Sequence, residues 1–291
     1  MQDERQETPV LSRGMKAVLA VSLAALLAAA AVFGVAMHDR AAYPRILEQV
    51  QALEPEQAQK TLGGVVFFHD PDEARYDRLV GLALQIADDP YAALGALAGE
   101  TFPAAFDPAC TALEQYALDA LMTQAQTAYA AGDYDTAQRD LELLCERDYA
   151  DAAQWLLLAR VRSGCSMPAL AALYSGTQEA VLGRLIELLP FADCPAAILS
   201  NTGCAEAFLT GRWTSADGKM LAMTHSSAGY QMQTDLLAEA ATGRFFLRDG
   251  VYAVGADEAR AQPLLRFEIV DADTVTVTRL SDGSIVTLTR A

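Results

Sequence analysis

"QTAYAAGDYDTAQRDLELL", residues 126–144, decides how the middle of the chain folds. Apolar residues recur at helical spacing on both sides of Gly132 and Asp133, which predicts two helices, 121–131 and 134–146, joined as a hairpin. The same spacing runs from Ile46 to about Leu199. Breaks within it are expected at Pro55, Gly63-Gly64, Asp88-Asp89-Pro90, Pro103, Gly132, Gly164 and Pro190. We therefore expect an all-α domain over 43–205.

The hairpin resembles the tetratricopeptide repeat, a helix-turn-helix unit of about 34 residues. The resemblance covers about residues 119–173. A step of that length from Leu121, at the family's first-helix Trp position, reaches Trp155. The family's Gly-Asp-Tyr and its small second-helix residue fall on Gly132, Asp133, Tyr134 and Ala137. Ala125, Ala128, Tyr149 and Arg162 depart from the family pattern, so we expect one good repeat and one partial repeat.

The resemblance implies a protein-binding scaffold, because such repeats stack into a curved surface. Carried over position by position, the partner-binding groove would be lined by Met122, Gln126, Tyr129, Leu156 and Arg160. The alternative is that these side chains pack between helices or form ordinary surface pairs.

A membrane anchor is expected near the N-terminus. Residues 17–37 carry no charge and would span about 30 Å as a helix, which is the thickness of a bilayer's hydrocarbon core. A cleaved signal is the alternative, although signal cores are usually shorter. Basic residues before the stretch favour a cytoplasmic tail, 1–16, with the later domains outside the cytoplasm, in a bacterial envelope.

Charge and cysteines narrow the choice of partners. The formal net charge is -17, and residues 43–208 hold 24 acidic and 9 basic side chains, which argues against unassisted binding to nucleic acid. The chain has 5 cysteines, an odd number, so at least one is expected to be free or paired between molecules. Cys194 and Cys204 are close enough in sequence to bridge; buried free thiols are the alternative.

From about Leu209 the apolar period changes to alternation, as in "LRFEI" (265–269) and "TVTVTR" (274–279). Turns are expected at Asp217-Gly218, Ala228-Gly229, Asp249-Gly250, Asp271-Ala272-Asp273 and Asp282-Gly283. These features predict seven or eight antiparallel strands over 209–291, closed as a small barrel or folded as a sandwich.

Gly211-x-Trp213 on the first strand, with Arg290 on the last, is similar to the lipocalin pattern, in which an Arg covers the Trp at the barrel floor. The resemblance implies a structural role in barrel closure for these three residues. An interior filled by Met223, Tyr230, Met232 and Leu288 is expected, and a ligand cup is the alternative.

Sequence motifs for catalysis, metals or cofactors are lacking. There is no G-x-S-x-G, H-E-x-x-H, S-x-x-K or phosphate-binding Gly-rich loop. "HDPDE" (69–73) mixes imidazole and carboxylates, but Pro71 makes a surface turn the better interpretation. We therefore expect a membrane-anchored, envelope-facing protein-interaction scaffold that is not an enzyme and has an unidentified protein partner. A small-ligand sensor using the β domain is the alternative, and an enzyme with a site between the domains is a second one.

Overall fold

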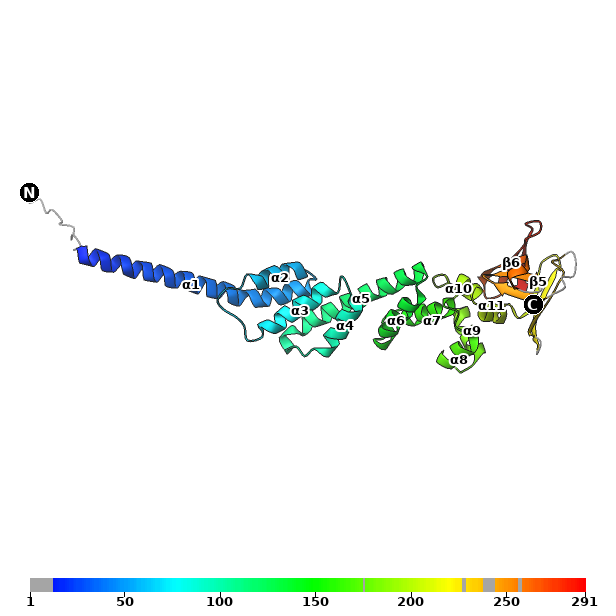
Figure 1. The fold of residues 1–291 in the computed structure, drawn as a ribbon, viewed down its shortest axis with the longest axis horizontal. Helices are drawn as coiled ribbons and strands as arrows, with labels where there is room; N and C mark the ends of the chain where they lie inside the picture. The colour runs from blue at the N-terminus through cyan, green and yellow to red at the C-terminus, as the bar shows by residue number, and fades with distance from the viewer. Residues whose placement is uncertain (1–12, 175, 227–228, 238–243, 256–257) are drawn as a thin grey trace, which may run out of the picture. The chain divides into compact units, whose positions relative to one another are not determined.

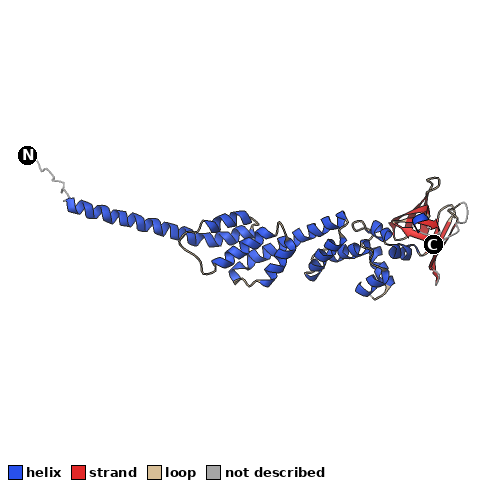
Figure 2. Cartoon of the chain, viewed as in Figure 1, coloured by secondary structure: helices blue, strands red, loops and turns tan. Residues whose placement is uncertain are grey.

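The computed structural model describes residues 13–174, 176–226, 229–237, 244–255 and 258–291. Over these ranges helices run up to Leu209 and strands dominate from Gly211 onward, as Figures 1 and 2 show. The expected order of an apolar helix, a helical region and an antiparallel sheet is confirmed. Most of the predicted tail, 1–16, and part of the predicted turn at Ala228-Gly229 lie outside the described residues.

Contacts between Cα atoms divide the chain into two compact units, Met1–Leu121 and Met122–Ala291. The division falls inside α5 (Asp107–Ala131). The domain limits 1–16, 17–37, 43–205 and 209–291 remain predictions.

Helix α1 (Arg13–Gln51) has two different parts. From Val18 to Gly34 every side chain is exposed, and the helix is long and apolar enough to cross a membrane. Farther along, Tyr43, Ile46 and Val50 are at most 4% exposed and belong to the core of the first unit. We expected the anchor and the helical domain as separate segments, but one helix contains residues of both. It continues through Pro44, where burial of the flanking apolar side chains outweighs the lost backbone hydrogen bond.

The rest of the first unit packs around this end of α1. It contains α2 (Pro55–Gly63), α3 (Glu73–Gln85), α4 (Pro90–Gly99), the short 3-10 helix η1 (Ala104–Phe106) and the first part of α5. In Figure 1, α2 and α3 lie along the C-terminal half of α1. The ring of Tyr76 packs at a tilt against the rings of Tyr43 and Phe106, at 4.9 and 4.5 Å between centroids, which joins α1, α3 and η1.

Helix α5 is longer than the predicted hairpin arm, because no Gly or Pro lies between Pro108 and Gly132 to break it. Gly132 then ends it with φ +81°, a left-handed value that Gly adopts without strain. The second unit continues through α6 (Tyr134–Glu146), α7 (Ala152–Arg162), α8 (Met167–Tyr174), α9 (Gln178–Glu187), α10 (Cys194–Ser200) and α11 (Thr202–Leu209).

The strands form one antiparallel sheet in the order β3-β2-β1-β8-β7-β6-β5-β4. Their bounds are β1 (Gly211–Thr214), β2 (Met220–Ser226), β3 (Gly229–Thr234), β4 (Arg244–Arg248), β5 (Val251–Gly255), β6 (Gln262–Asp271), β7 (Thr274–Arg279) and β8 (Ile285–Arg290). The sheet curls into a half-barrel, with β3 and β4 as its edges in the described part of the chain. The prediction of seven or eight short antiparallel strands is confirmed. Among the described residues the strands form one curled sheet whose edges do not pair, rather than the closed barrel or the sandwich that was expected.

Helices α10 and α11 pack on this sheet. The Gly250 N–H donates to the Leu199 carbonyl at 3.1 Å, and the Thr202 hydroxyl donates to the Leu247 carbonyl at 2.9 Å. The buried side of the sheet includes Trp213, Leu221, Met223, Tyr252, Leu265, Phe267, Val275 and Leu288. Met223 and Leu288 are inside as predicted and Met232 is half-buried, while the side chain of Tyr230 lies outside the described residues.

All five cysteines are free, so the bridge between Cys194 and Cys204 that the sequence allowed is not formed. Both thiols are buried. Cys194 donates to the Leu185 carbonyl at 3.4 Å, and the Cys204 sulfur lies 3.4 Å from that of Met167. Burial raises the pKa of each thiol to about 12, so both stay protonated near neutral pH.

Candidate functional site

Three of the five residues expected to line a groove are buried in the second unit. Met122, Tyr129 and Leu156 are 9%, 7% and 6% exposed, whereas Gln126 is half-buried. Arg160 donates to Glu142 at 2.7 Å and to the Tyr174 hydroxyl at 2.9 Å, and so links α6, α7 and α8. Such burial and pairing are what we expect if these residues pack between helices or form ordinary surface pairs, which is the alternative to a groove. The assignment of the five residues to a partner groove stays a prediction.

Tyr129 takes part in a polar contact that the sequence did not indicate. Its hydroxyl donates to Asp193 Oδ1 at 2.6 Å, and Arg162 donates to the other carboxylate oxygen. Burial, together with the hydrogen bond to Asp193, raises the pKa of the Tyr129 hydroxyl. The ring of Trp155 packs edge-on against Tyr129 at 5.1 Å and against Phe191 at 5.5 Å. The cluster holds α5, α7 and the segment before α10 together.

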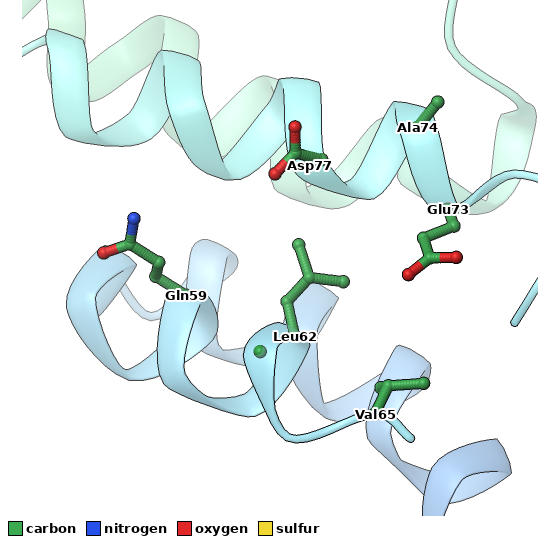
Figure 3. A pocket seen from close by; sticks show the side chains of 7 residues that line it. Gln59, Leu62, Val65, Glu73, Ala74 and Asp77 are labelled. Atoms are coloured by element: carbon green, nitrogen blue, oxygen red, sulfur yellow. The ribbon is translucent and has the colours of Figure 1, made fainter. Parts of the chain in front are cut away.

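An open pocket of about 620 Å³ lies between α2 and α3 in the first unit. Figure 3 shows side chains of α2 and of the segment after it on one side, and side chains of α3 on the other. The lining residues are Gln59, Leu62, Gly63, Val65, Glu73, Ala74 and Asp77. The pocket therefore combines apolar walls with two carboxylates.

The two carboxylates are spaced so that they share one face of α3. Glu73 and Asp77 are four residues apart, which places them one above the other on a helix. Glu73 Oε2 lies 2.7 Å from His69 Nδ1, and Asp77 is exposed. The nearby Arg75 and Arg78 pair instead with Asp72 and Glu100, so neither arginine neutralises the pocket. The pocket suits a basic side chain flanked by apolar ones.

The sequence pointed to this region only indirectly. The break predicted at Gly63-Gly64 is present, because α2 ends at Gly63. The turn predicted for His69 to Glu73 is confirmed only in part, since Pro71 and Asp72 form a turn and Glu73 already begins α3. What brings Gln59 and Leu62 opposite Asp77 is the packing of α2 on α3, which no local pattern reveals. The i, i+4 spacing of Glu73 and Asp77 was the one available signal.

Two further pockets lie in the second unit. One of about 420 Å³ is lined by Gly164, Ser166, Met167, Pro168, Gln178, Ser200, Asn201, Thr202, Gly203 and Glu206. The other, of about 220 Å³, is lined by Ala153, Gln154, Leu157, Arg184, Glu187 and Leu188. Asn201, which lines the 420 Å³ pocket, has a structural role, since its side-chain amide donates to the carbonyls of Val161 and Cys165 at 3.0 and 2.9 Å.

In the β sheet, Arg290 lies over the ring of Trp213. The assignment of Gly211, Trp213 and Arg290 to barrel closure stays a prediction. The guanidinium carbon lies 4.2 Å from the centre of the fully buried indole, whose N–H donates to the Leu209 carbonyl at 2.9 Å. Arg290 also donates to the carbonyls of Phe208 and Thr210 at 3.0 and 3.2 Å, at the end of α11. Gly211 has φ +123°, and a Cβ there would lie 3.5 Å from the guanidinium. The contact fastens α11 to β1 and β8.

Among the described residues, no group of three or more His, Cys, Asp or Glu side chains is arranged to hold a metal ion. The expectation that the chain is not an enzyme remains a prediction. No protein-family model, curated protein or solved structure matches this chain. The resemblances to the tetratricopeptide repeat and to the lipocalins therefore rest on the residues quoted above.

Proposed function

We propose that this chain is a single-pass membrane protein that holds a protein-binding helical platform beside the membrane, without catalytic activity. The proposal rests on one observation: α1 contains both the candidate membrane span and part of the core of the first unit. The side chains from Val18 to Gly34 are exposed and almost all apolar, whereas Tyr43, Ile46 and Val50 of the same helix belong to the core. An exposed apolar helix of this length is stable in a bilayer and not in water.

The platform's binding site in this proposal is the pocket between α2 and α3. Its carboxylates Glu73 and Asp77, set among apolar side chains, fit a partner segment that carries Lys or Arg next to an apolar residue. The acidity of the helical region supports the same class of partner, because it attracts basic surfaces at long range. In the extracytoplasmic orientation proposed from the flanking charges, this partner is an envelope protein.

The repeat-like hairpins of α5 to α8 have a supporting role in this proposal. Trp155 fills the space between Tyr129 and Phe191, as a tetratricopeptide-like stack requires, and Ala137 and Ala159 are fully buried where helices approach closely. The ligand-sensing alternative is less favoured, because large side chains such as Trp213, Tyr252 and Phe267 occupy the described inner face of the sheet.

Site-specific photocrosslinking in intact membranes tests the proposal. A photoreactive amino acid at Ala74, in the pocket, should give a crosslinked protein band that disappears in the Glu73→Lys, Asp77→Lys double variant. The same amino acid at Thr123, an exposed position on α5, is the matched control. Equal crosslinking from both positions, or crosslinks that survive the charge reversal, would exclude the pocket as the docking site. Full release of the protein by alkaline washing of the membranes would exclude the anchor.

A further inference from the structure

The segment joining α2 to α3 exposes three consecutive apolar side chains. Val66, Phe67 and Phe68 are 60%, 64% and 43% exposed. Scattered single apolar residues on a surface need no explanation, but a run of three that includes two aromatic rings is costly in water. Such a run needs a partner, and its position indicates which partner.

The backbone of this segment is fastened to α1. Asp39 Oδ2 accepts hydrogen bonds from the N–H groups of Phe67 at 2.8 Å and Phe68 at 3.0 Å, and the Asp39 side chain is fully buried. Tyr43, one helical turn farther along, donates to the Phe68 carbonyl at 3.4 Å and accepts from the Asp70 N–H at 2.9 Å. The exposed side chains are therefore held at a defined level of α1.

The loop is held at the position along α1 where the apolar stretch ends. Asp39 comes two residues after Met37, the last residue of the predicted span, which is about 3 Å along a helix. Side chains in a helix lean toward its N-terminus, so the carboxylate reaches back toward the preceding turn. Every side chain from Val18 to Gly34 is exposed, and Val35 and Ala36, in the turn before Asp39, are the first that are partly buried. The aromatic segment thus lies beside the last turn of the stretch that would cross the membrane.

A positive charge beside the loop also suits the boundary of a membrane. The guanidinium carbon of Arg40 lies 4.7 Å from the centre of the Phe68 ring, and the Arg40 side chain is exposed. Arg and aromatic side chains share the boundary between acyl chains and headgroups, because one end of the pair is apolar while the guanidinium contacts phosphate.

We propose that Val66, Phe67 and Phe68 insert into the interfacial layer of the bilayer beside α1, as a second membrane contact. The occupant of this apolar surface is the lipid of the leaflet at which α1 leaves the membrane. The inference rests on the proposed anchoring by α1. Its consequence is that the first unit has a fixed tilt and rotation on the membrane surface, since one helix and one loop hold it at two points.

The test uses the full chain in liposomes and measures quenching of Trp fluorescence. Phe67→Trp places a probe in the loop, and Tyr116→Trp, at an exposed aromatic position on α5 of the same unit, is the matched control. The emission of the parent, which contains Trp155 and Trp213, is subtracted from each variant. Lipids brominated near the headgroup should quench the loop probe several-fold more than the α5 probe. Aqueous iodide should quench the α5 probe several-fold more than the loop probe.

The outcomes separate the two proposals. If the parent fails to float with the liposomes after an alkaline wash, the anchor itself is wrong. If it floats but the two probes show equal lipid and iodide quenching, the anchor stands and the loop insertion is overturned. Adding Asp39→Asn to Phe67→Trp should lower the lipid quenching of the probe at least about two-fold, because the neutral amide accepts the two N–H groups more weakly. Unchanged quenching would overturn the role of Asp39 in holding the loop.

Discussion

Two glycines in different hairpins of the sheet have nearly the same φ but different surroundings. Gly250, between β4 and β5, has φ +72°, and Gly283, between β7 and β8, has φ +73°. A Cβ added to Gly250 would lie 2.9 Å from the Phe267 carbonyl oxygen and 3.3 Å from Leu199 Cδ1 of α10. A Cβ added to Gly283 meets nothing within 4 Å. The pair therefore separates backbone strain from close packing.

Both Gly→Ala substitutions force a left-handed backbone on a residue with a Cβ, which costs about 1–2 kcal/mol. Only Gly250→Ala adds a clash with a backbone oxygen, and overpacking of this kind costs about 1–3 kcal/mol more. We expect a destabilisation of about 1–2 kcal/mol for Gly283→Ala and about 2–5 kcal/mol for Gly250→Ala. The difference measures how closely the β4–β5 turn packs on β6 and α10.

Urea unfolding of the full chain in detergent provides the measurement. A Trp155→Phe background leaves Trp213 as the sole Trp, so its fluorescence reports on the β sheet alone. With an m value of about 2 kcal/mol/M, the expected difference places the Gly250→Ala midpoint about 0.5–1.5 M below that of Gly283→Ala. Coincident midpoints would refute the packing of this turn against Leu199 and Phe267.

Three further predictions concern Arg290, Glu206 and the cysteines. Arg290→Ala should lower the free energy of unfolding by about 1–3 kcal/mol in the same urea assay, because the ring contact and the hydrogen bonds to carbonyls are lost. Arg212→Ala, on the adjacent strand β1, is the control: its side chain is exposed, so the loss should be under about 0.5 kcal/mol. Burial raises the pKa of Glu206 above its ordinary 4.5, so its contribution to stability is present below that pH and is lost as pH rises through the folded-state pKa. Glu206→Gln should therefore raise the unfolding midpoint at neutral pH and leave it unchanged near pH 4. Mass spectrometry after brief iodoacetamide treatment should find Cys194 and Cys204 modified more slowly than the three half-buried thiols, and equal rates would contradict their burial.

Local features of the fold could be predicted from the sequence where one residue type decides the backbone. Gly132 and Gly164 end α5 and α7 because each takes a left-handed φ, +81° and +83°, that other residues avoid. Asp249-Gly250 forms the expected tight turn, with both residues at positive φ. The strand alternation is also confirmed, since Leu265, Phe267 and Ile269 are all buried on one face of β6.

Features that depend on distant contacts left no local signal. The buried Asp39 is satisfied by N–H groups 28 and 29 residues away, and Asp193 pairs with Tyr129 across 64 residues. Helical spacing puts Tyr116 on the same face as the buried Leu113 and Ala117, yet Tyr116 is 38% exposed. Periodicity predicts that a helix has a buried side, but the width of that side is set by which neighbours pack on it.

The pocket and the aromatic loop are parts of one short segment, and this couples the two proposals. Gly63, Val65 and Glu73 line the pocket, and Val66 to Phe68 lie between them in the chain. A basic segment bound between α2 and α3 would hold both ends of the loop, and a loop held in lipid would order two walls of the pocket. Such coupling is reciprocal, because each event lowers the conformational cost of the other. A partner should therefore bind more tightly to the chain in a bilayer than in detergent, by the same factor by which the partner strengthens insertion of the loop.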